Sequence, residues 1–216
     1  MNKRFVFGLF LALTLTACEK DVAILKDPTN PTPSTTTNYT PLTVGSYWVY
    51  DWYAVDSSGN STLLNITDSV YISADTIIGT DTYAIMEGTW FGFPPTRSFL
   101  RDSNGDLVNP GGGISFSATN YTDTLYHWNS GNGNETGYLK MDDIGEMVTV
   151  PAGTFRTLNA KYTVVNNVGT WPCFGKFDVH DNQYADNVGK VRSSFQFTSN
   201  PNCKVNEQRL RSYHIN

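Results

Sequence analysis

The apolar residues of the chain follow a strand pattern across residues 42–216. No segment there sustains a helical period, because apolar residues alternate or cluster in short runs rich in Val, Ile, Thr, Tyr, Phe and Trp. Gly, Asn, Asp and Pro bound these runs, as they bound strands at turns. The pattern predicts an all-β domain of antiparallel strands. They would form either a curved sheet of the half-barrel type or a sandwich-like arrangement.

Short strands separated by regularly spaced turns are predicted along the whole domain, which favours a meander. The predicted strands cover residues 46–56, 63–73, 82–90, 97–101, 107–109, 114–116, 125–128, 138–141, 146–150, 156–165, 174–179, 190–198 and 206–214. The clearest turn is Asn104-Gly105, since these residue types adopt the positive φ angles of a tight hairpin. Asp102, Asn104 and Asp106 also resemble the start of a calcium loop, but its glycine and glutamate are not at the required positions. A hairpin is therefore predicted here, and no calcium site.

Composition excludes two classes of protein. The chain has 15 Lys and Arg against 20 Asp and Glu, a formal net charge of −5, so it has no basic surplus to neutralise nucleic-acid phosphates. Its 12 Tyr, 12 Phe and 5 Trp exclude a mainly disordered chain, which could not bury so much aromatic surface. We expect a folded acidic domain without a nucleic-acid partner.

The first residues have the pattern of a secretory signal. Two basic residues precede an apolar run over residues 5–15, which is too short to cross a bilayer as a mature helix. The run ends in Leu-Thr-Ala-Cys at residues 15–18, which resembles the lipobox of bacterial lipoproteins. The resemblance implies a signal peptide over residues 1–17 and lipidation of Cys18, with membrane attachment through the lipid. An ordinary signal peptide with an incidental cysteine is the alternative.

A tether is predicted over residues 18–41, because Pro, Thr and Asn dominate residues 26–41 and no apolar period is present there. Directly after Cys18, Glu19-Lys20-Asp21 resembles the acidic export signal of Bacteroidetes-type surface lipoproteins. A charged spacer without that role is the alternative. The protein is thus expected in the cell envelope, lipid-anchored to the outer membrane and facing either the periplasm or the cell surface, with the all-β domain over residues 42–216.

Three segments of the domain carry a family resemblance. They are Pro-Leu-Thr-Val-Gly-Ser-Tyr-Trp-Val-Tyr at 41–50, Val-Thr-Val-Pro-Ala-Gly-Thr-Phe at 148–155 and Tyr-Ala-Asp-Asn-Val-Gly-Lys-Val at 184–191. Their order and spacing resemble a class of uncharacterised secreted lipoproteins, mostly of Bacteroidetes, whose domain is an all-β curved sheet. The resemblance implies no catalytic residues. Gly45, Gly153 and Gly189 are predicted to adopt turn conformations, and Pro151 to end a strand.

Two cysteines remain once Cys18 is lipidated. Cys173 and Cys203 both lie among turn residues, and an exported compartment allows thiols to oxidise. A disulfide between them is predicted, and two unpaired thiols are the alternative.

Candidate catalytic and metal-binding groups are scattered. Asp178, His180 and Asp186 could meet at a metal if the intervening chain turns, but no second His has ligand spacing, so a solvated polar loop and no metal site are predicted. Asp142, Asp143 and Glu146 could supply the paired carboxylates of a glycosidase, but Ile144-Gly145 looks like a turn and a solvated acidic loop is predicted instead. Nucleophile-elbow, phosphate-loop and zinc-protease motifs are absent from the sequence. No cofactor and no enzymatic activity are predicted.

The strand at residues 46–56 has bulky residues at both parities, so both of its faces need cover. Core packing of Trp48 and Trp52 is predicted, and a ligand-stacking platform is the alternative. The function that fits best is a non-catalytic outer-membrane lipoprotein module, structural or binding a glycan or envelope protein. A carrier of lipophilic molecules of the half-barrel type and, third, a surface polysaccharide hydrolase are the alternatives.

Overall fold

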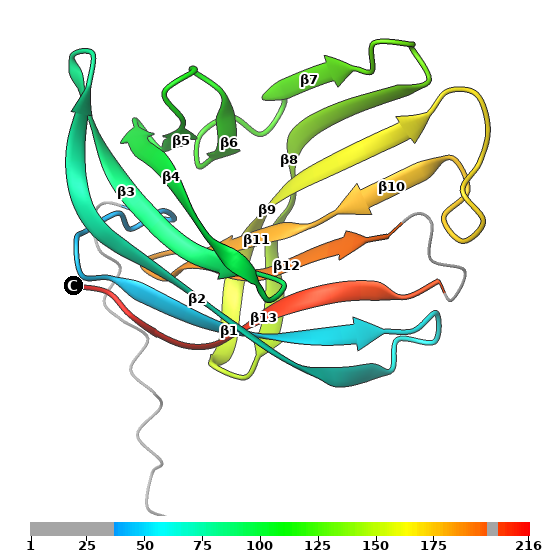
Figure 1. Ribbon diagram of the computed structural model, residues 1–216, viewed down its shortest axis with the longest axis horizontal. Coiled ribbons are helices and arrows are strands. Elements are labelled where there is room, and N and C mark those ends of the chain that lie inside the picture. Colours follow the sequence, from blue (N-terminus) through cyan, green and yellow to red (C-terminus); the bar gives the residue numbers. More distant parts are fainter. Residues whose placement is uncertain (1–36, 198–202) are drawn as a thin grey trace, which may run out of the picture. The chain divides into compact units, whose positions relative to one another are not determined.

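The computed structural model describes residues 37–197 and 203–216, which form an all-β domain without helices (Figure 1). The predicted signal peptide and Cys18 lie outside the described residues. Within the described residues, no helix has the length and apolar character needed to cross a membrane. The strands are β1 (Tyr47–Val55), β2 (Ser61–Ile78), β3 (Asp81–Trp90), β4 (Phe93–Ser103), β5 (Asp106–Val108), β6 (Ile114–Ser117), β7 (Tyr126–Asn129), β8 (Glu135–Val150), β9 (Gly153–Asn166), β10 (Phe177–His180), β11 (Asn182–Ala185), β12 (Gly189–Gln196) and β13 (Val205–His214).

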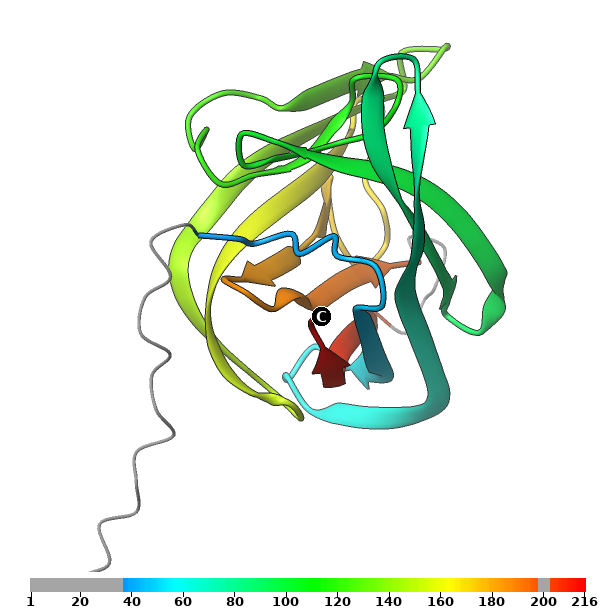
Figure 2. The same cartoon turned by 90° about the vertical axis from the view of Figure 1, so that its left-hand side faces the viewer.

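These strands form one antiparallel sheet in the order β6-β5-β4-β3-β2-β1-β13-β12-β11-β9-β8-β7, with β10 also paired to β9. The sheet curls until its two ends approach, as Figure 2 shows. There the Ser117 amide of β6 donates to the Met141 sulfur of β8 at 3.4 Å. The predicted all-β curved sheet is confirmed, in the form of a nearly closed barrel.

Local turn chemistry behaves as predicted at the β4–β5 hairpin. Asn104 and Gly105 have φ angles of 58° and 90° and connect the two strands. Gly153 and Gly189 also have positive φ angles, and β8 ends at Val150, directly before Pro151. Residue types with restricted or unusual backbone preferences therefore mark these strand ends correctly.

The predicted acidic loop between two strands is wrong, because β8 is a single strand through this region. Its register with β9 passes from Asp142 opposite Asn159 to Glu146 opposite Thr157, so the intervening residues form an irregular bulge. Asp143 and Gly145 take positive φ angles of 45° and 83° within it. A bulge needs the same residue types as a turn, which is why the sequence suggested one. The short strand β11 was missed.

The interior holds two hydrophobic clusters. One is formed by Trp48, Tyr50, Ile72, Ala84, Val148, Val150, Ala185, Val188, Val191 and Leu210. The other is formed by Leu107, Phe116, Leu139, Met141, Leu158 and Ala160. Leu42 packs against both clusters and so joins them.

Residues 37–43, called here the N-terminal segment, run across the open end of the barrel in front of β11 and β12 (Figure 2). The Asn38 amide donates to the Asp186 carboxylate at 2.6 Å, and the Asn187 amide donates back to the Asn38 carbonyl at 2.7 Å. The Tyr39 ring lies 5.7 Å from the ring of Phe116. The last residues assigned to the tether are therefore packed against the domain.

Candidate ligand-binding site

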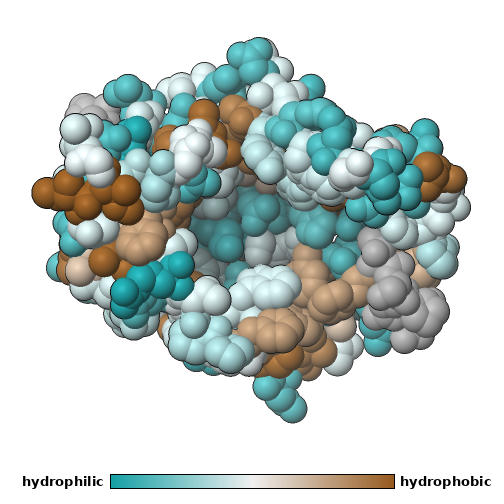
Figure 3. Space-filling view, turned by 45° about the horizontal axis from the view of Figure 1, so that its top comes forward, coloured by the Kyte–Doolittle hydropathy of each residue, from teal (hydrophilic) through white to brown (hydrophobic). Residues whose placement is uncertain are grey.

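A pocket of about 230 Å³ lies between the N-terminal segment and the inner face of the sheet. It is lined mostly by apolar side chains from strands on both sides of the barrel. The lining residues are Thr40, Pro41, Leu42, Trp48, Tyr50, Val70, Met86, Leu100, Leu107, Ser115, Tyr184, Gly189 and Lys190. The space-filling view shows a hollow at the centre of one face, with hydrophilic residues in its floor and hydrophobic residues along part of its rim (Figure 3).

Lys190 reaches this pocket because of a β-bulge in β12. Gln183 of β11 pairs with Arg192 and the next residue, Tyr184, pairs with Lys190, which leaves Val191 as an extra residue of β12. An extra residue changes the alternation of side chains along a strand. Lys190 therefore faces the pocket beside Tyr184, while Arg192 faces the other way and donates to Gln183.

The Lys190 ammonium has apolar and aromatic surroundings. It lies 6.0 Å from the centroid of the Tyr50 ring, and no residue that the structure describes forms a hydrogen bond or ion pair with it. Burial lowers the pKa of Lys190, and the charge of Asp68 partly opposes this shift. The pocket thus contains an amino group for which the described part of the protein provides no direct counter-ion.

Some of the other polar groups in the pocket form hydrogen bonds within the protein, and one does not. The Trp48 indole donates to the Val188 carbonyl at 2.6 Å, and the Tyr50 hydroxyl donates to the Lys190 carbonyl at 2.9 Å. The hydroxyl of Tyr184 has no hydrogen-bond partner among the described residues. Burial raises the pKa of Tyr184 to about 12, so its hydroxyl remains a donor at neutral pH.

Trp48 and Trp52 are both buried, with 3% and 0% of their surface exposed. Trp48 forms part of the pocket wall, whereas Trp52 packs edge-on against Trp90, Phe91 and Phe195. Trp52 therefore has no open ring face for a ligand in this conformation. The sequence did not single out Trp90 or Phe93, which are stacked 5.8 Å apart and are 44% and 56% exposed.

A fully buried carboxylate, Asp68, organises this aromatic cluster. It accepts hydrogen bonds from the Trp52 indole, from the Gln208 amide at 3.1 Å, and from the backbone of Phe91 at 2.8 Å and of Gly92 at 3.2 Å. Phe91 has a φ of 51°, an unusual conformation for a bulky residue. The carboxylate thus holds the tip of the β3–β4 hairpin against β1.

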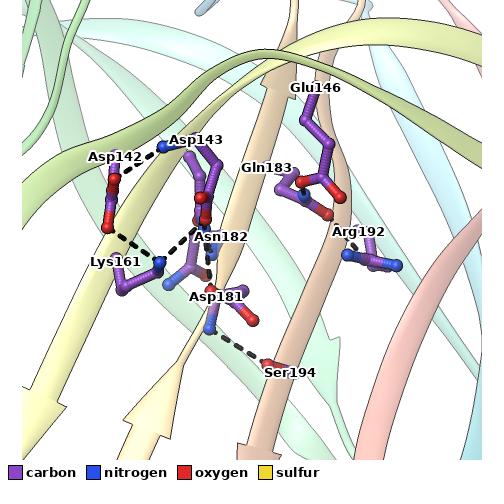
Figure 4. A network of polar contacts seen from close by, with 10 residues as sticks. Asp142, Asp143, Glu146, Lys161, Asp181, Asn182, Gln183, Arg192 and Ser194 are labelled. Atoms are coloured by element: carbon purple, nitrogen blue, oxygen red, sulfur yellow. Dashed lines mark hydrogen bonds and ion pairs between the residues drawn. The ribbon is translucent and has the colours of Figure 1, made fainter. Parts of the chain in front are cut away.

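The acidic residues considered for glycosidase chemistry take part in ion pairs and hydrogen bonds (Figure 4). Asp142 and Asp143 each lie 2.8 Å from the Lys161 ammonium, whereas Glu146 accepts from Gln183. Partial burial lowers the pKa of Lys161, but its hydrogen bonds to Asp142 and Asp143 outweigh burial and raise it. The hydrogen bond from Lys161 lowers the pKa of Asp142.

The suggested metal ligands do not come together. His180 lies 3.0 Å from the Asp178 carboxylate on the same strand, but Asp186 accepts from the Asn38 amide of the N-terminal segment instead. In the described ranges no three His, Cys, Asp or Glu side chains are grouped as metal ligands would be.

Cys173 and Cys203 form the predicted disulfide, with their Cα atoms 4.9 Å apart. It links the loop between β9 and β10 to the residues just before β13, across 30 residues of sequence. A bridge of this span stabilises a fold by roughly 3 kcal/mol.

Lys190 and Tyr184 were not selected as site residues from the sequence. Both lie in the family-like segment 184–191, which was interpreted as scaffold. If side chains alternated regularly through β12, Val191 would point to the inner face of the sheet and Lys190 to the outer face. Only the bulge brings Lys190 inside. Gly189, directly before Lys190 at the start of β12, is a weak sequence signal for such a bulge.

This geometry defines a class: a nearly closed antiparallel barrel with an apolar interior pocket. No family model matches the chain, and no curated protein matches it. A crystal structure described as that of an exported protein with a YmcC-like fold, from Bacteroides fragilis, is similar with a TM-score of 0.50 at 15% identity, over 83% of this chain and 100% of that one. Another, described as that of a lipoprotein from Parabacteroides distasonis, has a TM-score of 0.46 at 16% identity, over 84% of this chain and 100% of that one. At such low identity, the Bacteroides fragilis likeness shows a shared fold.

Proposed function

We propose that this protein is a lipid-anchored module of the outer membrane that binds a lipophilic small molecule inside its barrel without transforming it. The observation that carries the proposal is the interior pocket, in which apolar side chains from opposite walls surround an open space. Concave, mostly apolar pockets with a few polar groups are typical of small-molecule sites. The arrangement favours the half-barrel carrier over a purely structural module.

Two observations support a non-catalytic role. The carboxylates of Asp142 and Asp143 are paired with Lys161, and Glu146 is bonded to Gln183, so they are not arranged as an acid and a base flanking one substrate. The pocket itself is lined by no carboxylate and no histidine among the described residues.

Export and anchoring are supported by the lipobox-like residues 15–18 and by the likeness to an exported Bacteroides fragilis protein. We expect Cys18→Ala to abolish incorporation of radiolabelled palmitate and to release the domain from membranes, because the thiol would be the acylated atom. Labelling of the variant at the wild-type level would show that Cys18 is not the anchor.

Binding in the pocket is tested with N-phenyl-1-naphthylamine, a neutral dye whose fluorescence rises in apolar surroundings. The full chain should bind the dye, and Met86→Trp should weaken binding by about tenfold, because the larger ring occupies the pocket without a new charge. Met147→Trp is the matched control, since Met147 is 62% exposed and lies outside the pocket.

If Met86→Trp unfolds at a lower urea concentration than the wild type, Leu100→Trp repeats the test, because it fills the pocket from β4. Absence of dye binding to the wild type, or equal binding by the filled variants and the Met147→Trp control, would contradict the proposed function.

A further inference from the structure

Among the described residues that line the pocket, Lys190 is the one charged residue. Burying a charged group is unfavourable unless it is paired or hydrogen-bonded. The described residues provide no such partner for the ammonium, and its apolar surroundings lower the pKa of Lys190. The pocket therefore holds a lysine amino group that the described residues leave without a partner.

The bulge in β12 determines which way the Lys190 side chain points. If side chains alternated regularly through Val191, Lys190 would share the face of Arg192 and point away from the pocket. Bulges that re-aim one side chain occur next to functional sites more often than elsewhere. The backbone irregularity thus places the ammonium inside the barrel.

Tyr184 supplies a second donor among the residues that line the pocket. It is the cross-strand partner of Lys190, and its hydroxyl is not used by the described protein. Its ring packs 4.5 Å from Phe116, which fixes its position. An ammonium and a phenol on adjacent strands can together bind the two oxygens of a carboxylate.

We infer that Lys190 and Tyr184 bind the carboxylate of a fatty acid whose hydrocarbon chain lies among Leu42, Val70 and Leu100. This inference rests on the proposed function and names the ligand class of the same pocket. A single cation matches a monoanion, and the nearby negative charge of Asp68 disfavours a doubly charged group. The apolar walls match a hydrocarbon chain rather than a sugar.

The test compares decanoic acid with decan-1-ol, which has the same chain length but no charge. Both are titrated by calorimetry into the full chain carrying Cys18→Ala, so that no acyl group of the protein competes. We expect the acid to bind on the order of tenfold tighter than the alcohol, the gain of one charge-assisted hydrogen-bond pair. Lys190→Met should remove this preference while leaving the alcohol bound at least as tightly.

Two further variants sharpen the result. Lys140→Met is the matched control, because Lys140 also lies near a tyrosine ring, 5.9 Å from the centroid of Tyr138, but is exposed outside the pocket. Tyr184→Phe should lower acid binding about threefold and leave the alcohol unchanged, since only the hydroxyl is lost. Lys190→Met removes a partly buried amino group that has no partner among the described residues, and the variant is therefore expected to fold.

The outcomes separate the two proposals. Binding of both ligands with equal affinity by the wild type, or a preference for the acid that survives Lys190→Met, would overturn the carboxylate site and leave the lipophilic pocket standing. If the dye binds in the pocket but neither ligand binds or displaces it, the fatty-acid inference is wrong and the lipophilic pocket stands; if the dye does not bind either, the proposed function itself is wrong.

Discussion

Asp68→Ala should lower the free energy of unfolding by about 4 kcal/mol. The substitution leaves four donors without their acceptor: the Trp52 indole, the Gln208 amide and the backbone amides of Phe91 and Gly92. Because Asp68 is fully buried, water cannot replace the carboxylate without opening the hairpin tip. Phe91, with its φ of 51°, would also lose the contact that holds its unusual conformation.

The measurement is urea unfolding of the oxidised protein, followed by circular dichroism. Asp75→Ala is the matched control, since Asp75 is an exposed residue of the same strand β2, and it should change stability by no more than about 0.5 kcal/mol. Asp68→Asn keeps the shape of the side chain and should give an intermediate loss. An Asp68→Ala variant as stable as the control would show that the network does not hold the hairpin.

Trp52→Ala should cost about 3–5 kcal/mol, the range for truncating a fully buried aromatic side chain. The indole makes edge-on contacts with three other rings and donates to Asp68, so both packing and a hydrogen bond are lost. Trp90→Ala should cost clearly less, because 44% of Trp90 is exposed. Equal losses for the two variants, again measured by urea unfolding, would contradict the assignment of Trp52 to the centre of the core.

A cycle of Trp52→Phe, Asp68→Asn and the double variant separates packing from hydrogen bonding. The two single losses should sum to more than the loss of the double variant, since both remove the same hydrogen bond. Additive losses would mean that the indole and the carboxylate act independently.

The sequence predicted those parts of the fold that local chemistry determines. The Asn104-Gly105 hairpin, the end of β8 before Pro151 and the bond between Cys173 and Cys203 follow from backbone preferences and from oxidation in an exported compartment. Alternating apolar residues likewise identified the strands and the all-β class.

The sequence could not reveal features that depend on register. Ile144-Gly145 has the residue types of a turn, and only pairing with β9 shows that the chain continues as one bulged strand. The inward direction of Lys190 depends on the unpaired Val191, which residue types do not encode. Asp68 is polar, yet the hairpin tip folded over it makes it part of the interior.

The most direct test of ligand binding inside the barrel is nuclear magnetic resonance with methyl-labelled protein and decanoic acid. We predict intermolecular nuclear Overhauser effects from the acyl chain to the methyl groups of Leu42, Val70, Leu100 and Leu107, which line the pocket. Effects confined to exposed side chains such as Met147 and Val168, with the pocket methyls unchanged at saturating ligand, would contradict an interior binding site.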